Sequence, residues 1–333
     1  MNHSTRHILR SLTRRLNLDS LISRSGRNSF FPFYHTVSPR PLPHVSHLYR
    51  VMNPEEFERD LDQLLKWFEP VSLGDYLEHQ ALGRGERRTM VLTFDDGLKE
   101  CHQYIAPILI KKGVPAIFFL NNQFIDNRGL FYRYKASLLI DRLRKESSSM
   151  QRAATFMRTP VKQVEGSILN FGYSQRAQLD LLSGELEVDF TAYLQSSPVY
   201  MNTSEVKDLL GWGFEIGGHS ADHVEFSGLE PSEMILQVTS SLVDLEERFG
   251  RRSGYFSFPF TSDGVPERVI DTLLEEKIAD ALLGSAGLKR TGKPAFIQRV
   301  PMEQFEAPAL QVLKAEYLHY LLKRVAGRDR LRY

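Results

Sequence analysis

A short apolar run over residues 90–94 ends in two adjacent carboxylates, Asp95 and Asp96, followed by Gly97. The residues of the run favour β-strands, so we predict a buried strand whose end carries the two acidic side chains. Neighbouring carboxylates repel each other and lose hydration when they are buried, so a positive group, most simply a metal ion, should lie against them. This stretch therefore predicts an active site at the end of a strand.

Segments that favour helices and strands alternate around this strand. Asn53 and Pro54 begin an amphipathic helix, residues 71–73 suggest a short edge strand, residues 74–82 a second helix and residues 114–120 another buried strand. This order predicts an α/β fold with a parallel sheet, in which ligands gather at the carboxyl ends of the strands. A chain of 333 residues is within the range of an α/β barrel with insertions.

The sequence divides into four predicted regions. Residues 1–28 form a basic amphipathic N-terminal arm, residues 29–303 the barrel and residues 304–333 a C-terminal helix. Residues 126–196 contain helical segments and few strand signals, which predicts a helical insertion within the barrel, on the same rim as the site.

The N-terminal arm interleaves Arg6, Arg10, Arg14 and Arg15 with aliphatic residues at helical spacing. A helix of this kind is able to lie on an anionic membrane surface, which makes peripheral membrane contact one expectation. The alternative is a helix that packs on its own domain with its arginines in water, as terminal arms usually do.

Composition excludes several classes of protein. The formal net charge is +1, so no global signal points to nucleic acid, and we expect no nucleic-acid partner. Because Cys101 is the only cysteine, a disulfide framework and a cysteine-based zinc site are both excluded, and oxygen and nitrogen must hold any metal. The sequence contains neither a run apolar enough to span a membrane nor the h-region of a signal peptide, so we expect a cytoplasmic protein.

A second strand-like segment ends in two glycines and is followed by His219 and His223. Their spacing lets both imidazoles face one point if the chain turns helically after His219. Two histidines and one carboxylate are a common ligand set for zinc, iron, nickel or cobalt, with positions left open for water and substrate. A lone His-x-x-x-His pair also occurs in ordinary turns, but its combination with Asp95 and Asp96 in one alternating architecture favours a metal site.

Two further polar residues follow predicted strands. Asn121 comes directly after the strand at residues 114–120, where its amide is expected to line the site, although turn chemistry explains it equally well. His35 lies in an aromatic strand-like run over residues 30–37, and a lone histidine in such a run is more often structural than catalytic.

Together these motifs resemble those of polysaccharide deacetylases of the NodB-homology type, carbohydrate esterase family 4. Residues 93–97 match the first motif of that family, residues 219–223 match the second, and residues 256–260 resemble the third more loosely. The resemblance extends over residues 30–300 apart from the insertion. It implies a distorted, incomplete (β/α) barrel and metal-dependent hydrolysis of the N-acetyl group of a sugar, in a polysaccharide or its precursor.

The resemblance also implies roles for individual residues. Asp95 would be the general base, and Asp96, His219 and His223 would hold a divalent metal, with zinc expected first and cobalt, nickel or iron as alternatives. The family's third motif often carries an arginine that orients the base, and Arg299 is the candidate substitute. The expected contacts to the carbohydrate substrate are Tyr34, Asn121, Phe258, Pro259, Phe260 and Arg299.

The general acid of the family is usually a histidine on a late strand. Here only His319 follows His223, and it lies in a predicted amphipathic helix. In a circularly permuted subgroup, the poly-N-acetylglucosamine deacetylases, the late strand comes first and carries an aromatic-Tyr-His run. Because residues 33–35 fit that run, the resemblance assigns the role of general acid to His35.

The sequence is also compatible with two alternative functions. The loose third motif favours a catalytically weak metal-binding barrel that acts as a sugar-binding or scaffold protein. The same metal chemistry would also serve a hydrolase of another amide or of an O-acetyl ester.

Overall fold

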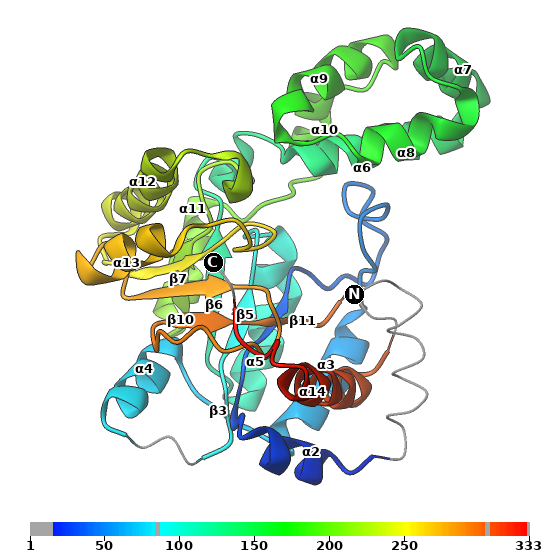
Figure 1. Ribbon diagram of the computed structural model, residues 1–333. Helices are drawn as coiled ribbons and strands as arrows, with labels where there is room; N and C mark the ends of the chain where they lie inside the picture. The colour runs from blue at the N-terminus through cyan, green and yellow to red at the C-terminus, as the bar shows by residue number, and fades with distance from the viewer. Residues whose placement is uncertain (1–15, 84–86, 304–306, 332–333) are drawn as a thin grey trace.

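The computed structural model describes residues 16–83, 87–303 and 307–331, and within them a parallel eight-stranded sheet forms the centre of the molecule (Figure 1). Every pairing within this sheet is parallel. In spatial order its strands are β10 (Phe296–Gln298), β9 (Ala281–Gly284), β8 (Tyr255–Ser257), β7 (Glu215–Gly218), β6 (Ala116–Leu120), β5 (Leu92–Phe94), β2 (Pro32–Tyr34) and β11 (Val300–Pro301).

The two edge strands of this sheet are consecutive in the chain, because only Arg299 separates β10 from β11. β10 pairs with β9, whereas β11 pairs with β2 at the opposite edge. Across this seam, the Arg299 amide donates to the carbonyl of Gly284 at 3.0 Å and the Val300 amide donates to Phe31 at 2.8 Å. The sheet therefore curls back on itself, and the predicted incomplete (β/α) barrel is confirmed.

A smaller sheet joins β1 (Ser29–Phe30), β4 (Thr89–Met90) and β3 (Glu69–Pro70). Because β1 and β4 directly precede β2 and β5, this sheet extends the amino ends of two barrel strands. The edge strand predicted at residues 71–73 lies two residues earlier, where β3 forms an edge of this sheet. The Ser72 side chain accepts a hydrogen bond from the Asp75 amide and caps α4 (Leu73–Ala81), so the helix begins where the strand was expected.

Helices cover the outer face of the barrel (Figure 1). The first of them, α3 (Pro54–Leu65), begins with a capping box between Asn53 and Glu56 and buries the apolar face that the sequence predicts. The others are α5 (Ala106–Lys112), preceded by one π-helical turn (Cys101–Ile105), α11 (Thr203–Gly211), α12 (Pro231–Phe249) and α13 (Glu267–Glu275).

Between residues 126 and 196 every regular element is helical, and in Figure 1 the longer helices form a green layer that projects from one end of the barrel. Residues such as Leu139, Val164 and Leu182 are fully buried in a hydrophobic cluster shared by these helices. The helices are α6 (Tyr132–Lys145), α7 (Ser147–Phe156), α8 (Val164–Leu169), α9 (Arg176–Glu185) and α10 (Phe190–Ser196).

The two ends of the described chain lie together. Helix α2 (Leu18–Ser25) buries Leu18, Leu21 and Ile22 in the cluster that also contains residues of α14 (Ala309–Val325). This part of the predicted N-terminal arm therefore packs on its own domain. The four arginines of the arm, Arg6 to Arg15, lie outside the described residues, and peripheral membrane contact and a cytoplasmic location stay predictions.

Among the described residues, none of the helices combines the length and apolar character that crossing a bilayer requires.

Candidate active site

Chemically active side chains follow neighbouring strands at the carboxyl end of the barrel. His35 follows β2, Asp95 and Asp96 follow β5, and His219 follows β7. These residues and His223 line one cleft of about 370 Å³. Because the carboxyl ends of parallel strands meet at one edge, residues far apart in sequence are brought together there.

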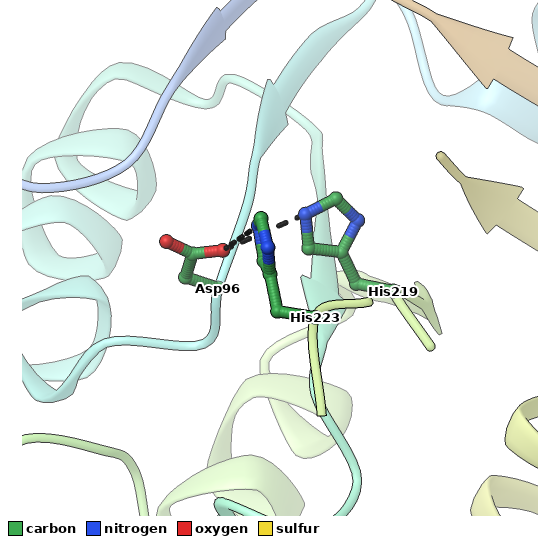
Figure 2. A group of neighbouring side chains, drawn as sticks. All are labelled: Asp96, His219 and His223. Carbon is green, nitrogen blue, oxygen red and sulfur yellow. Dashed lines mark ion pairs between the residues drawn. The ribbon is translucent and has the colours of Figure 1, made fainter. Parts of the chain in front are cut away.

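Three of these residues form a buried group that is suited to a metal ion. The ligand atoms of Asp96, His219 and His223 all lie within 4.8 Å of one another. Asp96 Oδ1 is 3.5 Å from His219 Nε2 and 3.2 Å from His223 Nε2, and Figure 2 shows the three side chains converging. The structure thus brings together the three residues predicted to hold a metal.

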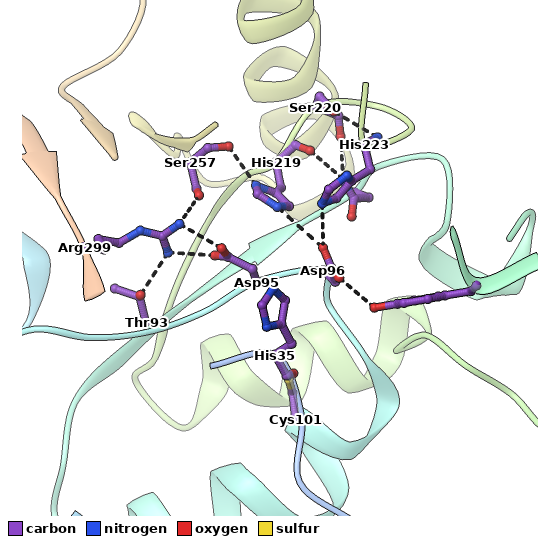
Figure 3. A network of polar contacts seen from close by, with 12 residues as sticks. His35, Thr93, Asp95, Asp96, Cys101, His219, Ser220, His223, Ser257 and Arg299 are labelled. Atoms are coloured by element: carbon purple, nitrogen blue, oxygen red, sulfur yellow. Dashed lines mark hydrogen bonds and ion pairs between the residues drawn. The ribbon is translucent and has the colours of Figure 1, made fainter. Parts of the chain in front are cut away.

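Neighbouring groups orient these side chains. His219 Nδ1 donates to the carbonyl of Ser257 at 2.7 Å, which leaves its Nε2 lone pair facing Asp96 (Figure 3). The hydroxyl of Tyr134 donates to Asp96 Oδ2 at 2.7 Å, whereas the buried Asp96 Oδ1 has no hydrogen-bond partner. A carboxylate oxygen and an imidazole lone pair that face each other in a dry site repel unless a cation lies between them, so the residues present fit a divalent metal ion.

The backbone of the site adopts conformations that most residues avoid. Asp96, Ser220 and His223 have φ values of 71°, 60° and 61°. Each such left-handed position outside glycine costs of order 1 kcal/mol or more, so the surrounding packing must hold it. After the aspartates, Gly97 has a φ of 67°, and a Cβ there would lie 2.9 Å from the Leu120 side chain. The positive φ is the main reason for glycine at this position, and the nearby methyl group of Leu120 adds to it.

Asp95 points to a buried arginine instead of the metal group. Its two carboxylate oxygens each accept a hydrogen bond from Arg299 at 2.8 Å (Figure 3). Arg299 also donates to Thr93 Oγ1 at 3.0 Å and to Ser257 Oγ at 2.6 Å, and it is 1% exposed. Burial acts to raise the pKa of Asp95, but the guanidinium outweighs it and holds the pKa below its usual value. Asp95 therefore stays ionised.

His35 reaches the same cleft from the other side, held by a residue that the sequence did not single out. Glu303 Oε2 lies 2.6 Å from His35 Nδ1, and Glu303 Oε1 accepts from the backbone amides of His35 and Thr36 at 2.8 and 3.0 Å. Burial acts to lower the pKa of His35, but the Glu303 carboxylate outweighs it and raises that pKa to about 9. The imidazole is therefore protonated at neutral pH.

The predicted substrate contacts are only partly met by the geometry. Phe258, Phe260 and Arg299 line the cleft, whereas Pro259 lies between the two phenylalanines and does not. Arg299 stacks over the ring of Phe33, with its guanidinium carbon 4.6 Å from the ring centroid, and Phe33 also lines the cleft.

Two of the predicted contacts are wrong in this structure. Tyr34 is fully buried and packs its ring against Phe57 and Phe94, because neighbouring residues of a strand face opposite sides and Phe33 takes the cleft side. The buried amide of Asn121 donates to the carbonyl of His219, so it supports the histidine loop from behind.

The helical insertion supplies part of the cleft wall, which the sequence did not predict in detail. Phe131, Arg133 and Tyr134, at the start of α6, line the cleft with Leu48 and Tyr49 from the loop after β2. The sequence predicts that the insertion lies on the rim of the site, but no sequence pattern indicates which of its residues face the cleft.

Comparison with known proteins assigns the chain to a family. A sequence model of the polysaccharide deacetylase family matches residues 83–154 and 174–275, which together make up more than half of the chain. The chain belongs to the polysaccharide deacetylase family. The unmatched residues between the two segments lie in the helical insertion. Carbohydrates are the substrates of polysaccharide deacetylases, and the family assignment supports carbohydrate deacetylation as the class of reaction.

Solved structures support the fold. IcaB from Ammonifex degensii matches with a TM-score of 0.54 and 16% identity, covering 86% of this chain and 97% of that one. The Streptococcus pyogenes deacetylase PplD, solved with acetate, matches with a TM-score of 0.54 and 11% identity over the same shares. BC0361, a polysaccharide deacetylase from Bacillus cereus, matches with a TM-score of 0.52 and 13% identity, covering 86% of this chain and 68% of that one. These likenesses confirm the predicted NodB-type barrel.

A search of curated proteins gives no match to this member of the polysaccharide deacetylase family.

Proposed function

We propose that the protein is a metal-dependent carbohydrate N-deacetylase that hydrolyses the N-acetyl group of a sugar, in a polysaccharide or its precursor. The observation that carries this proposal is the buried group of Asp96, His219 and His223 in one cleft with an ionised Asp95 and a protonated His35. Amide hydrolysis requires a base and an acid on either side of the reacting carbon, together with stabilisation of the developing oxyanion.

The residues divide the work according to their surroundings. A divalent ion held by Asp96, His219 and His223 would supply Lewis acidity toward the amide carbonyl oxygen. Asp95, ionised and fixed by Arg299, accepts the proton of the attacking water. His35 donates its proton to the leaving nitrogen, so that the products are acetate and a free amine on the sugar. Two nitrogen ligands and one oxygen ligand suit zinc, with cobalt, nickel or iron as alternatives.

The scaffold alternative loses its main support. It rested on a third motif without an arginine, yet Arg299 supplies that guanidinium from the seam of the barrel, 2.8 Å from both oxygens of Asp95. A base held by a bidentate arginine supports a catalytic site over a site that only binds sugar.

The test is acetate release from N-acetylhexosamine oligomers by protein loaded with zinc, cobalt or nickel, compared with chelated protein. Because Asp95 is the base, Asp95→Asn should lower kcat by about 10²-fold to 10⁴-fold and keep the bound metal. His219→Ala should lose both metal and activity.

Metal content by elemental analysis separates these outcomes. Metal-loaded protein that binds the oligomers but releases no acetate would contradict the proposal and select the sugar-binding alternative. Acetate release from an acetyl ester, and not from the N-acetylated oligomers, would identify the protein as an O-deacetylase.

A further inference from the structure

The cleft contains one cation that no protein carboxylate neutralises. Asp95 pairs with Arg299, and Glu303 pairs with His35, so these charges are balanced within the site. Arg133, from the first turn of α6, lines the same cleft and makes no ion pair with a carboxylate among the described residues. Its positive charge is therefore available to a ligand.

Aromatic rings hold this guanidinium in place. The guanidinium carbon of Arg133 lies 5.3 Å from the centroid of the Phe260 ring and 6.0 Å from that of Tyr132. Its Nε is buried and has no hydrogen-bond partner. Because the buried Nε is out of reach of a ligand, the outer end of the guanidinium is the part of Arg133 that faces the cleft.

Arg133 also stands close to the reaction centre. The Phe260 ring that it covers lies 4.5 Å, between centroids, from the imidazole of His223, one of the three candidate metal ligands. The Phe131 ring also packs on that imidazole, with 4.3 Å between centroids, and it lies 6.0 Å from the Phe260 ring. A sugar whose acetamide reaches the metal group would therefore place its neighbouring substituents, or the next residue of its chain, beside Arg133.

We propose that Arg133 binds an anionic group of the substrate, a carboxylate or a phosphate, carried on or next to the N-acetyl sugar. The planar fork of arginine matches either oxyanion with two parallel hydrogen bonds. This inference rests on the proposed deacetylase function, and it makes that function specific for an acidic glycan or a phosphorylated sugar precursor.

The experiment compares three N-acetylated probes on zinc-loaded protein: neutral diacetylchitobiose, a disaccharide of N-acetylglucosamine and glucuronic acid, and N-acetylglucosamine 1-phosphate. Arg133→Gln should raise KM for one or both acidic probes about 10-fold or more, and leave KM for the neutral probe within about twofold. Whichever acidic probe responds identifies the oxyanion as carboxylate or phosphate.

Two further variants sharpen the test. Arg133→Lys keeps the charge and loses the fork, so it should recover part of the affinity for the acidic probe. Arg144→Gln is the matched control, because it removes an arginine from the same helix that pairs with Glu165 on the surface and does not line the cleft. Arg144→Gln should leave KM unchanged for the acidic probes and for the neutral probe.

Equal KM values for acidic and neutral probes in the wild-type protein, or an equal loss on all probes in Arg133→Gln, would overturn the proposal while the enzyme remains active. If no probe releases acetate, the proposed function fails instead. Calorimetric titration of the same probes then decides the role of Arg133. Tighter binding of an acidic probe that Arg133→Gln abolishes would support it, and equal affinities would refute it.

Discussion

His35 and Glu303 show how single residues acquire their chemistry from contacts that span the chain. The two are 268 positions apart, yet Glu303 accepts hydrogen bonds from the His35 backbone and lies 2.6 Å from its ring. One carboxylate therefore fixes both the position and the charge of the imidazole. An acid with a pKa near 9 stays protonated over the neutral range and loses its proton only in alkaline solution.

Replacing Glu303 should shift the alkaline limb of the pH profile. Glu303→Gln keeps the shape and the acceptor for the backbone amides but removes the charge that raises the pKa of His35. Burial, the largest influence on that pKa, then acts to lower it against only the smaller effects of Asp96 and Asp95. The alkaline limb of kcat/KM should therefore move to lower pH, by about one unit or more. The measurement is kcat/KM for acetate release between neutral and alkaline pH.

Two controls identify the titrating group. His35→Gln should lower the plateau value of kcat/KM and remove the alkaline limb of its pH profile. An alkaline limb that stays in place in Glu303→Gln would mean that another group loses the proton.

At the scale of elements, a hydrogen bond connects the helical insertion to one of the candidate metal ligands. Tyr134, in the first turn of α6, is fully buried and donates to Asp96 Oδ2. Its ring stacks on Tyr200 and meets Phe131 edge to face, so the hydroxyl has little freedom to turn away. The insertion therefore contributes to the geometry of the metal ligands as well as to the cleft wall.

Removing this hydroxyl should weaken metal binding. Tyr134→Phe preserves the ring and its packing but leaves Asp96 Oδ2 without its donor. Because neighbours of metal ligands typically contribute 10-fold to 100-fold to affinity, we expect a zinc dissociation constant roughly 10-fold to 100-fold higher. Competition with a chromophoric chelator measures it.

Tyr193→Phe is the matched control, since it removes a hydroxyl of the insertion that contacts His44 and not Asp96. Equal zinc affinity in Tyr134→Phe and wild type would show that Asp96 needs no support from α6.

The elements also show which parts of the site a sequence can predict. The strand ends that carry Asp95, Asp96 and His219 were predictable because their apolar runs, glycines and polar ends are local patterns. It was harder to predict which side of a strand a side chain faces, because a shift of one residue reverses the side. Tyr34 packs against Phe57 of the surrounding helix α3, whereas its neighbour Phe33 faces the cleft.

Glu303 and Arg133 were not predictable for a different reason. Neither belongs to a local motif, and each reaches the cleft only through long-range packing: β11 beside β2, and α6 across the rim. Asn121 follows its strand as expected, but its amide is used by the backbone of the histidine loop. Such details depend on how the strands of the incomplete barrel come together and not on the pattern of any one segment.

At the scale of the whole molecule, Arg299 connects the seam of the barrel with the candidate active site. It lies at the seam between β10 and β11, and its guanidinium donates to Asp95 after β5, to Ser257 on β8 and to the carbonyl of Gly284 on β9. Its guanidinium carbon lies 4.6 Å from the ring centroid of Phe33 on β2 and 5.3 Å from that of Phe119 on β6. One side chain thus contacts five of the strands around the barrel interior.

Removing this guanidinium should destabilise the whole barrel. Arg299→Met keeps much of the volume but leaves Asp95 as an uncompensated buried charge, which typically costs about 3–5 kcal/mol. We expect a clear fall in the free energy of unfolding at neutral pH, measured by denaturant titration of metal-free protein.

The pH dependence supplies the control. In the wild type the folded-state pKa of Asp95 is depressed, so its stabilising contribution is present above the unfolded pKa and is lost as the pH falls through the folded value. Arg299→Met should therefore differ most from wild type at neutral pH and less in acid, where Asp95 becomes neutral. Adding Asp95→Asn to Arg299→Met should restore much of the lost stability. A constant difference at all pH values, with no rescue by the second change, would mean that Arg299 stabilises the barrel by packing alone.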